Sequence, residues 1–495
     1  MWLELSLLII FLVIYYYYFI NNWNYWSSQD VVGPKPSIPF GTVGDIVIGK
    51  HNLGTYLQEI YTTYKKSKLV GVYRLRKPIL IVNDLDLIKD VLIKDFSKFA
   101  DRGREIHDKH EALAVNLFNL EPQRWRPLRS KLTPMFTSVK LKDMFYLLVQ
   151  CADQMETYLD KFENGQVDMR EIATRFTTDV IGVCVFGLQA NALAEEDSLF
   201  RKMGKRIFEL NIRNVGRTIL GSFLPELYKV VGYFFRDSVL DNFFIGITKD
   251  TMDYRRKNRI NRHDFVDLLI ELKDEPSKVG ELELTDKVLA AQLFVFFAAG
   301  FETSSTTIGN ALYEMALNHS VQEKLRQEIK DELIRTDGKF TYEGVKNMKY
   351  LDKVFLETLR KYPPLPFLTR RSMEPYTFTG TNLTIPAKTE VWIPMLGIQR
   401  DPEYYPNPSV FNPEHFSEEQ VKSRHDMTFL SFGDGPRNCI GARFGLMQTK
   451  IGVITVLRNH TVDICDKTDH NYEVDHRAFL LVPKNGIFLN INRAV

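Results

Sequence analysis

One cysteine of the chain stands in a loop whose residue types suit a metal-bound thiolate. The segment Phe432-Gly433-Asp434-Gly435-Pro436-Arg437-Asn438-Cys439-Ile440-Gly441 is rich in glycine and leads into a helix-compatible run from Phe444. A thiolate needs positive potential and N–H donors, and the backbone amides at the start of that run would point at the Cys439 sulfur. The residues therefore indicate an iron-binding thiolate, with a buried structural cysteine in an ordinary turn as the alternative.

An acid and a hydroxyl group stand side by side in Ala299-Gly300-Phe301-Glu302-Thr303. This pentapeptide lies in the middle of Asp286 to Leu317, a proline-free run that follows Thr285, a good N-cap residue. The run is apolar on nearly every side, which predicts one long helix buried through the protein. A glycine followed by a hydroxyl residue can open a small groove in such a helix. The alternative is a threonine bonded back to a carbonyl beside a surface glutamate.

Two charged residues, Glu357 and Arg360, are three apart and share a face of an expected helix. Such a pair is usually a solvated salt bridge that contributes little to stability. The segment Phe411-Asn412-Pro413-Glu414-His415-Phe416 follows downstream and gives the pair a candidate third member in His415.

A tryptophan and an arginine, Trp125 and Arg129, are four apart and can point the same way from a helix. Pro127 lies between them and is tolerable only in the first turn of a helix. We therefore expect this helix to start near Arg124.

Composition sets the protein class. The 495 residues are 44% hydrophobic and 25% charged, with a formal net charge of +2, so we expect neither disorder, a polytopic membrane protein nor a nucleic-acid partner. Four scattered cysteines without a Cys-x-x-Cys pair argue against a disulfide framework or a zinc site and suit a reducing compartment. They are Cys151, Cys184, Cys439 and Cys465.

The amino terminus predicts a membrane anchor. From Trp2 to Ile20 the one charged residue is Glu4, and a helix of this length spans about 28 Å, close to the hydrocarbon thickness of a bilayer. Aromatic residues cluster at its distal end, as at a membrane interface. A cleaved signal peptide is the alternative, but no basic n-region or small-residue cleavage signal is present. The first basic residue, Lys35, follows the span, which favours a cytosolic body.

The rest of the chain predicts one body that is mainly α with small β-sheets, an α+β fold. Residues 1–22 are the expected transmembrane anchor, 23–41 a proline-rich hinge and 42–495 the catalytic domain. Leu69 to Leu75 and Ile79 to Val82 predict a β-hairpin, and further strands are expected at Glu390 to Ile393 and near Phe479 to Val482.

Together these motifs resemble the cytochrome P-450 family of monooxygenases over nearly the whole chain. The loop fits Phe-x-x-Gly-x-Arg-x-Cys-x-Gly, the haem-binding pattern of that family. The resemblance implies a single haem domain with a long central helix, and haem b held by Cys439 as the axial ligand of its iron. It implies contacts to the haem from Cys439, Arg437, Phe432, Gly435, Gly441, Trp125, Arg129, Arg370 and Ala299.

The same resemblance gives roles to the other motifs. Thr303 and Glu302 occupy the positions that help to deliver protons during oxygen activation. Glu357, Arg360 and His415 form a structural network behind the haem loop, in which His415 replaces the usual arginine and should make a weaker, pH-sensitive contact. The substrate pocket is expected to be lined by predominantly apolar residues, namely Phe118, Val295, Ala298, Leu365, Thr369 and Leu480.

The implied reaction is insertion of one oxygen atom of dioxygen into a lipophilic substrate. No Gly-x-Gly-x-x-Gly fingerprint is evident, so NADPH electrons should arrive through a separate flavoprotein reductase on the cytosolic face of the endoplasmic reticulum, with cytochrome b5 as a further possible donor. The residues expected on the face that receives the reductase are basic, namely Arg124, Arg126, Lys131, Arg437, Arg443 and Lys450.

The segments Leu359 to Pro366 and Gly435 to Phe444 look most like insect microsomal members that oxidise plant toxins and insecticides. Three alternatives stay open: hydroxylation of an endogenous lipid or hormone, isomerisation or dehydration of a peroxide, and a non-catalytic haem-thiolate sensor. Members that rearrange peroxides typically lack the acid and threonine present here as Glu302 and Thr303. The sequence does not name the substrate.

Overall fold

A computed structural model describes residues 2–20, 22–162, 165–209, 211–262, 264–275 and 282–494 of the chain. Its central element is α13 (Asp286–Leu317), the long helix predicted from the sequence with the same bounds. The Thr285 side chain caps it by accepting a hydrogen bond from the N–H of Val288 at 3.3 Å. Among the described residues α13 alone is long and apolar enough to cross a membrane, yet 67% of its apolar window is buried inside the protein. It is a core helix.

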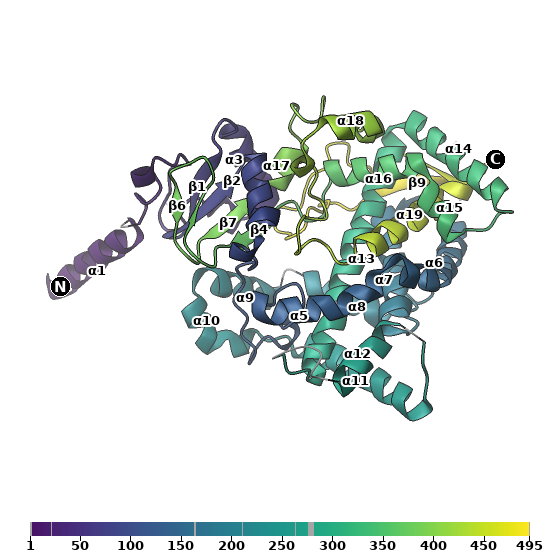
Figure 1. Ribbon diagram of the computed structural model, residues 1–495, viewed down its shortest axis with the longest axis horizontal. Helices are drawn as coiled ribbons and strands as arrows, with labels where there is room; N and C mark the ends of the chain where they lie inside the picture. Colours follow the sequence, from purple (N-terminus) through teal and green to yellow (C-terminus); the bar gives the residue numbers. More distant parts are fainter. Residues whose placement is uncertain are drawn as a thin grey trace.

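Helices make up most of the fold around α13 (Figure 1). In chain order they are α1 (Trp2–Ile20), α2 (Gly44–Val47), α3 (Leu53–Thr63), α4 (Leu85–Lys89), α5 (Pro122–Leu132), α6 (Ser138–Leu159), α7 (Met169–Ile181), α8 (Leu199–Phe208), α9 (Ile212–Phe223), α10 (Pro225–Val231), α11 (Ser238–Asn258), α12 (Phe265–Asp274), α14 (His319–Arg335), α15 (Tyr342–Asn347), α16 (Lys349–Lys361), α17 (Met395–Gln399), α18 (Glu418–Ser423) and α19 (Ala442–Asn459). The predicted α+β class, mainly helical, is confirmed.

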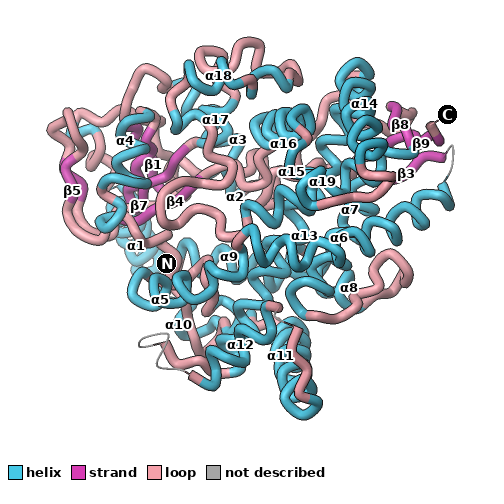
Figure 2. Tube along the Cα trace, turned by 45° about the vertical axis from the view of Figure 1, so that its right-hand side comes forward, coloured by secondary structure: helices cyan, strands magenta, loops and turns pink. Residues whose placement is uncertain are grey.

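The strands form three small sheets. The first has the order β1-β2-β7-β4, with the β2–β7 pair parallel and the other two pairs antiparallel. Figure 2 shows it on one side of the helices and the sheet β3-β9-β8 beside the C-terminus. The strands are β1 (Leu69–Arg74), β2 (Lys77–Val82), β3 (Gly165–Asp168), β4 (Leu368–Arg371), β5 (Tyr376–Thr377), β6 (Thr384–Ile385), β7 (Glu390–Ile393), β8 (His460–Asp463) and β9 (Phe488–Arg493).

The predicted hairpin and the strand Glu390–Ile393 are confirmed, whereas the strand expected near 479–482 is wrong. That segment is aliphatic because it packs into the interior without pairing along a sheet. The N–H of Leu481 donates to the carbonyl oxygen of Pro364 at 2.9 Å, and the last strand, β9, begins only at Phe488.

The expected start of α5 needs a similar correction. The helix begins at Pro122 after Glu121, so Pro127 lies inside it rather than in its first turn. Proline at 127 removes the N–H that would bond to the carbonyl oxygen of Gln123. Gln123 is exposed, so water can satisfy that carbonyl group.

The N-terminal segment joins the body through tryptophans. Figure 1 shows α1 extending away from the rest of the protein. The side chain of Trp26 is buried, and its indole N–H donates to Val72 O at 3.1 Å. The indole N–H of Trp23 donates to Leu75 O at 2.9 Å. Trp26 is one of the aromatic residues that follow the expected anchor, where a membrane interface was predicted, and it fixes this segment to β1. The division at residues 22 and 41 stays a prediction.

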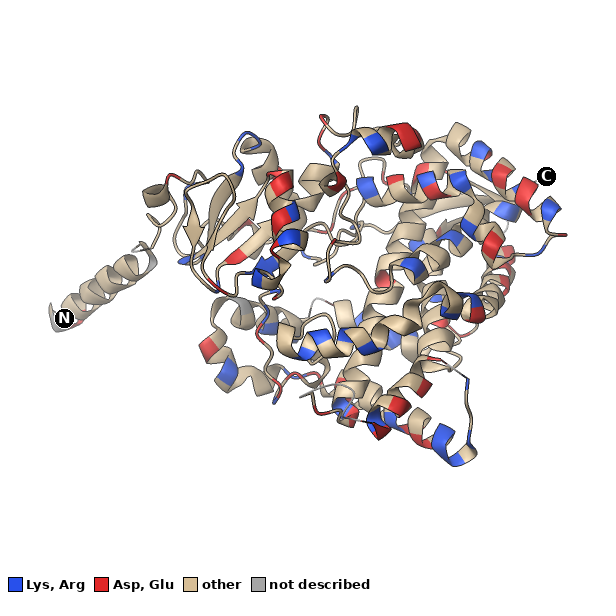
Figure 3. Ribbon diagram, in the orientation of Figure 1, with Lys and Arg blue, Asp and Glu red and all other residues tan. Residues whose placement is uncertain are grey.

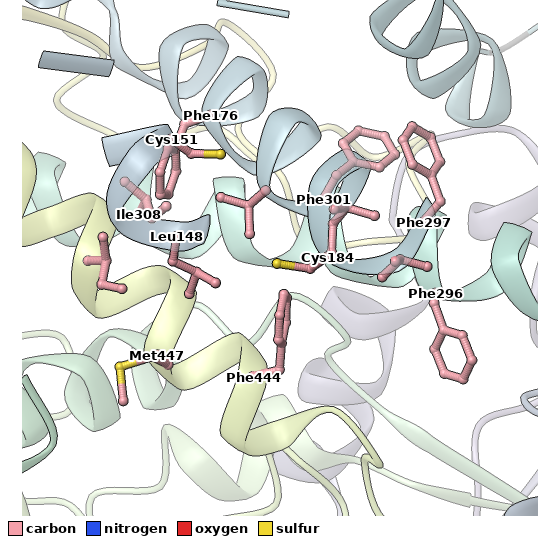
Figure 4. Close-up of a cluster of buried hydrophobic side chains, with 14 of the residues drawn as sticks. Leu148, Cys151, Phe176, Cys184, Phe296, Phe297, Phe301, Ile308, Phe444 and Met447 are labelled. Atoms are coloured by element: carbon pink, nitrogen blue, oxygen red, sulfur yellow. The ribbon is translucent and has the colours of Figure 1, made fainter. Parts of the chain in front are cut away.

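Aromatic packing fixes the helices that flank the loop. Figure 4 shows Phe297 and Phe301 of α13, Phe176 of α7 and Phe444 of α19 in one buried cluster. The rings of Phe297 and Phe301 lie 5.0 Å apart between centroids. Since Phe444 lies in the first turn of α19, this packing also fixes the end of the loop that precedes that helix.

Candidate functional site

The cysteine loop is a turn closed by its own backbone and continued by α19. The N–H of Cys439 donates to Phe432 O at 2.8 Å, and the N–H of Asn438 donates to Gly435 O at 3.0 Å. Gly435 has a φ of +70°, and a Cβ built there would lie 1.9 Å from the carbonyl oxygen of Leu92. Glycine at 435 is therefore required by the close approach of two backbone segments.

Opposing influences act on the Cys439 thiol. Burial raises its pKa although the residue is accessible to solvent, whereas the backbone N–H of Gly441 and the cations Arg129 and Arg102 lower it. An amide donor and two cations suit a sulfur that carries negative charge as a metal ligand. A Cβ on Gly441 would meet the Phe136 ring at an ordinary 3.7 Å, so the chain itself leaves room at this position.

Guanidinium groups converge beside the loop, two of them buried and two half-buried. Arg370 and Arg437 are the buried pair, and Arg102 and Arg129 are half-buried. Arg437 is 2% exposed and donates from Nε to Ala100 O at 3.0 Å and from Nη2 to Leu120 O at 2.7 Å. Its guanidinium carbon lies 4.0 Å from the centre of the Trp125 ring. The backbone carbonyl groups and the ring hold this cation in place without neutralising it.

Burial and the neighbouring positive charges lower the pKa values of these arginines. Burial, then Arg102 and Arg370, lower the pKa of Arg437 to about 8. Burial and Arg102 lower the pKa of Arg370 to about 9, and burial lowers the pKa of Arg102 to about 10. The buried Nε of Arg370 has no hydrogen-bond partner among the residues that the structure describes. Crowded cations with an unused donor fit a ligand that carries carboxylates, so the residues present fit a haem with two propionates.

Helix α5 presents Trp125 and Arg129 to the same loop. Arg129 donates from Nη1 to the carbonyl oxygen of Asn438 and from Nη2 to its Oδ1, both at 2.9 Å. Trp125 is buried beneath Arg437. Both side chains therefore brace the residues next to Cys439, and a direct contact between either of them and a haem stays a prediction.

Arg102 also lies at this site, although no sequence motif indicated it. Its Nη2 donates to the carbonyl oxygen of Arg437 at 2.9 Å and its Nη1 to that of Phe118 at 3.1 Å. The guanidinium carbon lies 4.0 Å from the centre of the Phe118 ring. A lone arginine in a loop has no distinctive spacing, so only the fold could place it here.

The middle of α13 is accessible on one face, although residues 304–316 of the same helix are all buried. Ala299 is exposed, and Val295, Ala298 and Thr303 are half-buried. Nearby, Nε2 of Gln448 on α19 donates to the carbonyl oxygen of Gly300 at 3.4 Å. Since α19 starts three residues after Cys439, this contact brings the accessible face and the cysteine loop into one region.

Thr303 and Glu302 face different neighbours. The Thr303 hydroxyl donates to the carbonyl oxygen of Ala299 at 2.6 Å, on the accessible face. Glu302 is 7% exposed and forms an ion pair with Arg170 of α7. The glutamate is therefore buried rather than on the surface. A Cβ on Gly300 would lie 2.5 Å from the end of the Ile181 side chain, so a larger residue at 300 would displace that side chain of α7.

Glu357 and Arg360 form a fully buried ion pair on α16. Arg360 donates to both carboxylate oxygens of Glu357 at 2.7 Å, and Nδ1 of His415 lies 3.1 and 3.3 Å from them. Burial raises the pKa of Glu357, but Arg360, His415 and the N–H of Asn412 outweigh it, and the pKa is lowered. Nε2 of His415 lies 2.9 Å from Pro406 O. His415 thus occupies the expected third position with two contacts.

A glutamine that the sequence did not indicate connects this network to the loop. Arg360 donates from Nη1 to the carbonyl oxygen of Gln399 at 3.0 Å. The Oε1 of Gln399 accepts from the N–H of Leu430 at 2.9 Å and from the Ser431 hydroxyl at 3.1 Å. Residues 430 and 431 immediately precede Phe432, so the buried pair supports the start of the loop.

Four of the expected pocket residues lie on segments that hydrogen bonds connect two by two. Phe118 and Thr369 both contact Arg102, whose carbonyl oxygen accepts from the Thr369 hydroxyl at 3.2 Å. The segments of Leu365 and Leu480 are joined by the Leu481–Pro364 hydrogen bond. Phe118 is exposed, Leu365 and Thr369 are half-buried and Leu480 is buried. Their role as a substrate pocket stays a prediction.

The expected basic surface is smaller than predicted. Arg437 and Lys450 are buried, because Arg437 binds backbone carbonyl groups and the Lys450 ammonium pairs with Asp352 at 2.7 Å. Arg124 pairs with Glu121 and Asp108. The accessible residues of the set that pair with no acid in the described part of the chain are Arg126, Lys131 and Arg443. In Figure 3 the ribbon of α5 carries the blue of Lys and Arg at several positions.

Comparison with known proteins gives one family. The family model described as "Cytochrome P450" matches residues 32–490. The chain is 39% identical to "Cytochrome P450 6A1" of Musca domestica over 478 residues, which cover 95% of this chain and 94% of that protein. It is 39% identical to "Probable cytochrome P450 6a14" of Drosophila melanogaster over 493 residues, 96% of each chain. It is 37% identical to "Cytochrome P450 6B7" of Helicoverpa armigera over 479 residues, 95% of this chain and 94% of the relative.

Proposed function

The chain belongs to the cytochrome P450 family of haem-dependent monooxygenases, and from this premise we propose that it hydroxylates or epoxidises lipophilic xenobiotics such as plant toxins or insecticides. The electrons come from NADPH through a separate flavoprotein reductase. Likeness to insect proteins of one P450 group supports the xenobiotic class. Oxidation of an endogenous lipid or hormone is the second candidate, because the expected apolar lining would suit both kinds of substrate.

The observation that carries the proposal is the cysteine thiol beside four converging arginines. Cys439 would hold the iron of haem b, and Arg102, Arg370 and Arg437 would hold its propionates. Bound haem supplies the activation of dioxygen and the oxidation of the substrate. The chain positions this group, shields it and supplies protons.

The residues of α13 supply the proton-handling groups of the proposal. The accessible hydroxyl of Thr303 would hold a proton near the reacting atoms, and the adjacent carboxylate of Glu302 would replenish it. The small side chains Ala298 and Ala299 leave space beside them. The remaining expected lining residues are mostly apolar, which would exclude water and favour a lipophilic substrate.

The proposed location is the endoplasmic reticulum membrane, with α1 as a single-pass anchor and the catalytic domain in the cytosol. Residues 4–18 form an apolar stretch of α1. Large apolar side chains are also exposed on α9 and on the segment after α10, with Ile212 90% and Phe234 80% exposed. Figures 1 and 2 place α10 at the same end of the protein as α1. We propose that this end rests on the bilayer.

Redox partners would dock at the accessible cations Arg126, Lys131 and Arg443. Members of the family use a redox partner and a small-molecule substrate. An acidic reductase would be steered to this face by charge, and cytochrome b5, which also donates electrons, is the second proposed partner.

A substrate panel with the membrane-reconstituted full chain, purified reductase and NADPH tests the proposal. We expect oxygenated products from lipophilic plant toxins or insecticides, with one product formed per NADPH at best. Products from endogenous lipids or hormones alone would favour the second candidate. A haem-loaded protein that binds these compounds but consumes no NADPH with any of them would support a sensor instead. Protein that washes off membranes in carbonate would contradict the anchor.

A further inference from the structure

We propose that Arg170 is a positioning residue that keeps the Glu302 carboxylate charged and directed toward α7, so that it can take up a proton and pass it toward Thr303. The inference rests on the proposed proton-supply role of Glu302 and Thr303. It assigns a residue outside the family motifs to that function.

The backbone of Arg170 is fixed at the start of α7. The N-cap carboxylate of Asp168 accepts from the N–H of Arg170 at 3.1 Å and from that of Glu171 at 3.3 Å. The same oxygen accepts from the N–H of Ile487 at 3.2 Å, which ties the turn to the segment before β9. From this anchored position Nη2 of Arg170 reaches Oε1 of Glu302.

Burial makes the pair sensitive to the loss of either partner. The Glu302 side chain is 10% exposed and that of Arg170 is 26% exposed, so Arg170 lies on the solvent side of the pair. An ionised carboxylate at such a depth requires a cation or donors to remain charged. In the described structure, the Glu302 carboxylate interacts with Arg170 through this ion pair.

Arg170 neutralises the charge of Glu302 but contacts its carboxylate through a single nitrogen atom. One Nη atom of Arg170 contacts the carboxylate, and within the described part of the chain its buried Nε has no hydrogen-bond partner. A two-point fork would lock the carboxylate, whereas a one-point contact allows it to turn. Asp168 and Tyr472 are the titratable neighbours of the arginine, and the Tyr472 hydroxyl is engaged with Asn310 Oδ1 at 2.7 Å.

Arg170→Gln in the full-length holoenzyme tests the proposal. Removing the cation leaves the buried Glu302 carboxyl group without its ion-pair partner, and burial without a partner disfavours the charged form. We expect an infrared carbonyl band of a protonated carboxyl group that is absent from the wild type and lost again in R170Q/E302Q. Product formed per NADPH should fall by about threefold or more, since a removed proton-transfer group typically costs more than tenfold in rate. Arg170→Lys should restore the charge and keep this yield within about twofold of the wild type.

Arg201→Gln is the matched control, because Arg201 forms a comparable part-buried pair with Glu171 of α7 and does not contact Glu302. It should leave the band and the yield unchanged. Equal losses in R201Q and R170Q, or an R170Q enzyme with normal yield and no new band, would overturn the proposal. If R170Q does not bind haem, Arg170→His tests the proposal in its place. The product that this variant forms per NADPH must then fall more between pH 6 and pH 8 than that of the wild type.

Thr303→Ala separates this inference from the function on which it rests. If T303A releases more peroxide per NADPH while R170Q behaves as the wild type, the role of Arg170 is wrong and the proposed function stands. If T303A changes nothing, the proton-supply role of Thr303 is what fails. The infrared band then still decides whether Arg170 controls the charge of Glu302.

Discussion

Nδ1 of His415 lies 3.1 Å from Oε1 of Glu357, at the place where the family pattern has an arginine. The other ring nitrogen lies 2.9 Å from the carbonyl oxygen of Pro406. Both neighbours are hydrogen-bond acceptors, so a hydrogen on either ring nitrogen finds a partner. The histidine therefore connects Glu357 to the Pro406 carbonyl group through one compact side chain.

Replacing His415 by alanine should destabilise the loop region. Glu357 would lose a donor and the Pro406 carbonyl group would lose its partner, at a cost of about 1–3 kcal/mol. Denaturant unfolding of the holoenzyme measures this loss. His415→Arg restores donors and should recover most of the stability. A free energy of unfolding in H415A equal to that of the wild type would show that the His415 contacts do not stabilise the protein.

The lowered pKa of Glu357 predicts a loss of stability in acid. A carboxyl group whose pKa is lower in the folded than in the unfolded protein stabilises the fold above its unfolded pKa. That contribution disappears as the pH falls through the folded pKa, below the ordinary value of 4.5. Unfolding free energies measured from pH 6 downward should therefore decline more steeply in the wild type than in Glu357→Gln. Parallel curves would contradict the assignment.

Arg370→Gln should weaken retention of haem. Its buried Nε lacks a partner in the described structure, and its positive charge would be matched by a propionate. We expect the rate of haem transfer to apomyoglobin to rise by about tenfold, which corresponds to about 1.4 kcal/mol. Arg371→Gln is the control, because Arg371 pairs with Asp101 at 2.5 Å. Equal loss of haem from both variants would point to general damage to β4.

Reversing the charge of Arg443 should weaken reductase docking. In Arg443→Glu we expect the reductase concentration for half-maximal turnover to rise several-fold at low ionic strength and the difference to shrink in salt, because exposed charges are screened. Turnover driven by a peroxide in place of reductase should not change. Arg335→Glu, on α14, is the control. A defect that does not depend on salt would argue against electrostatic docking.

Sequence patterns predicted the contiguous parts of this protein well. The bounds of α13 follow from Thr285 and an unbroken apolar run, because capping and periodicity are local properties. The segment 479–482 shows the limit of such patterns. Aliphatic residues that pack in the interior and those that pair in a sheet look alike in a short window.

Contacts between distant segments were much less predictable. Lys450 looks like a surface cation, yet the fold buries it against Asp352. Arg102 contributes to the site by a hydrogen bond to Arg437, and Gln399 by one from Leu430. Both partners are more than thirty positions away in the sequence, and neither Arg102 nor Gln399 stands in a motif with distinctive spacing. The motif residues that gather around Cys439 were accessible to prediction because they share a family pattern.

The most direct test of the account is the spectrum of the reduced carbon monoxide complex of the full-length protein. We predict the red-shifted Soret band of thiolate-ligated haem in the wild type and its absence in Cys439→Ala. Cys465→Ala removes a different buried cysteine and should retain the band. Absence of the band from folded, haem-loaded wild type, or its persistence in C439A, would contradict the assignment of Cys439 as the iron ligand.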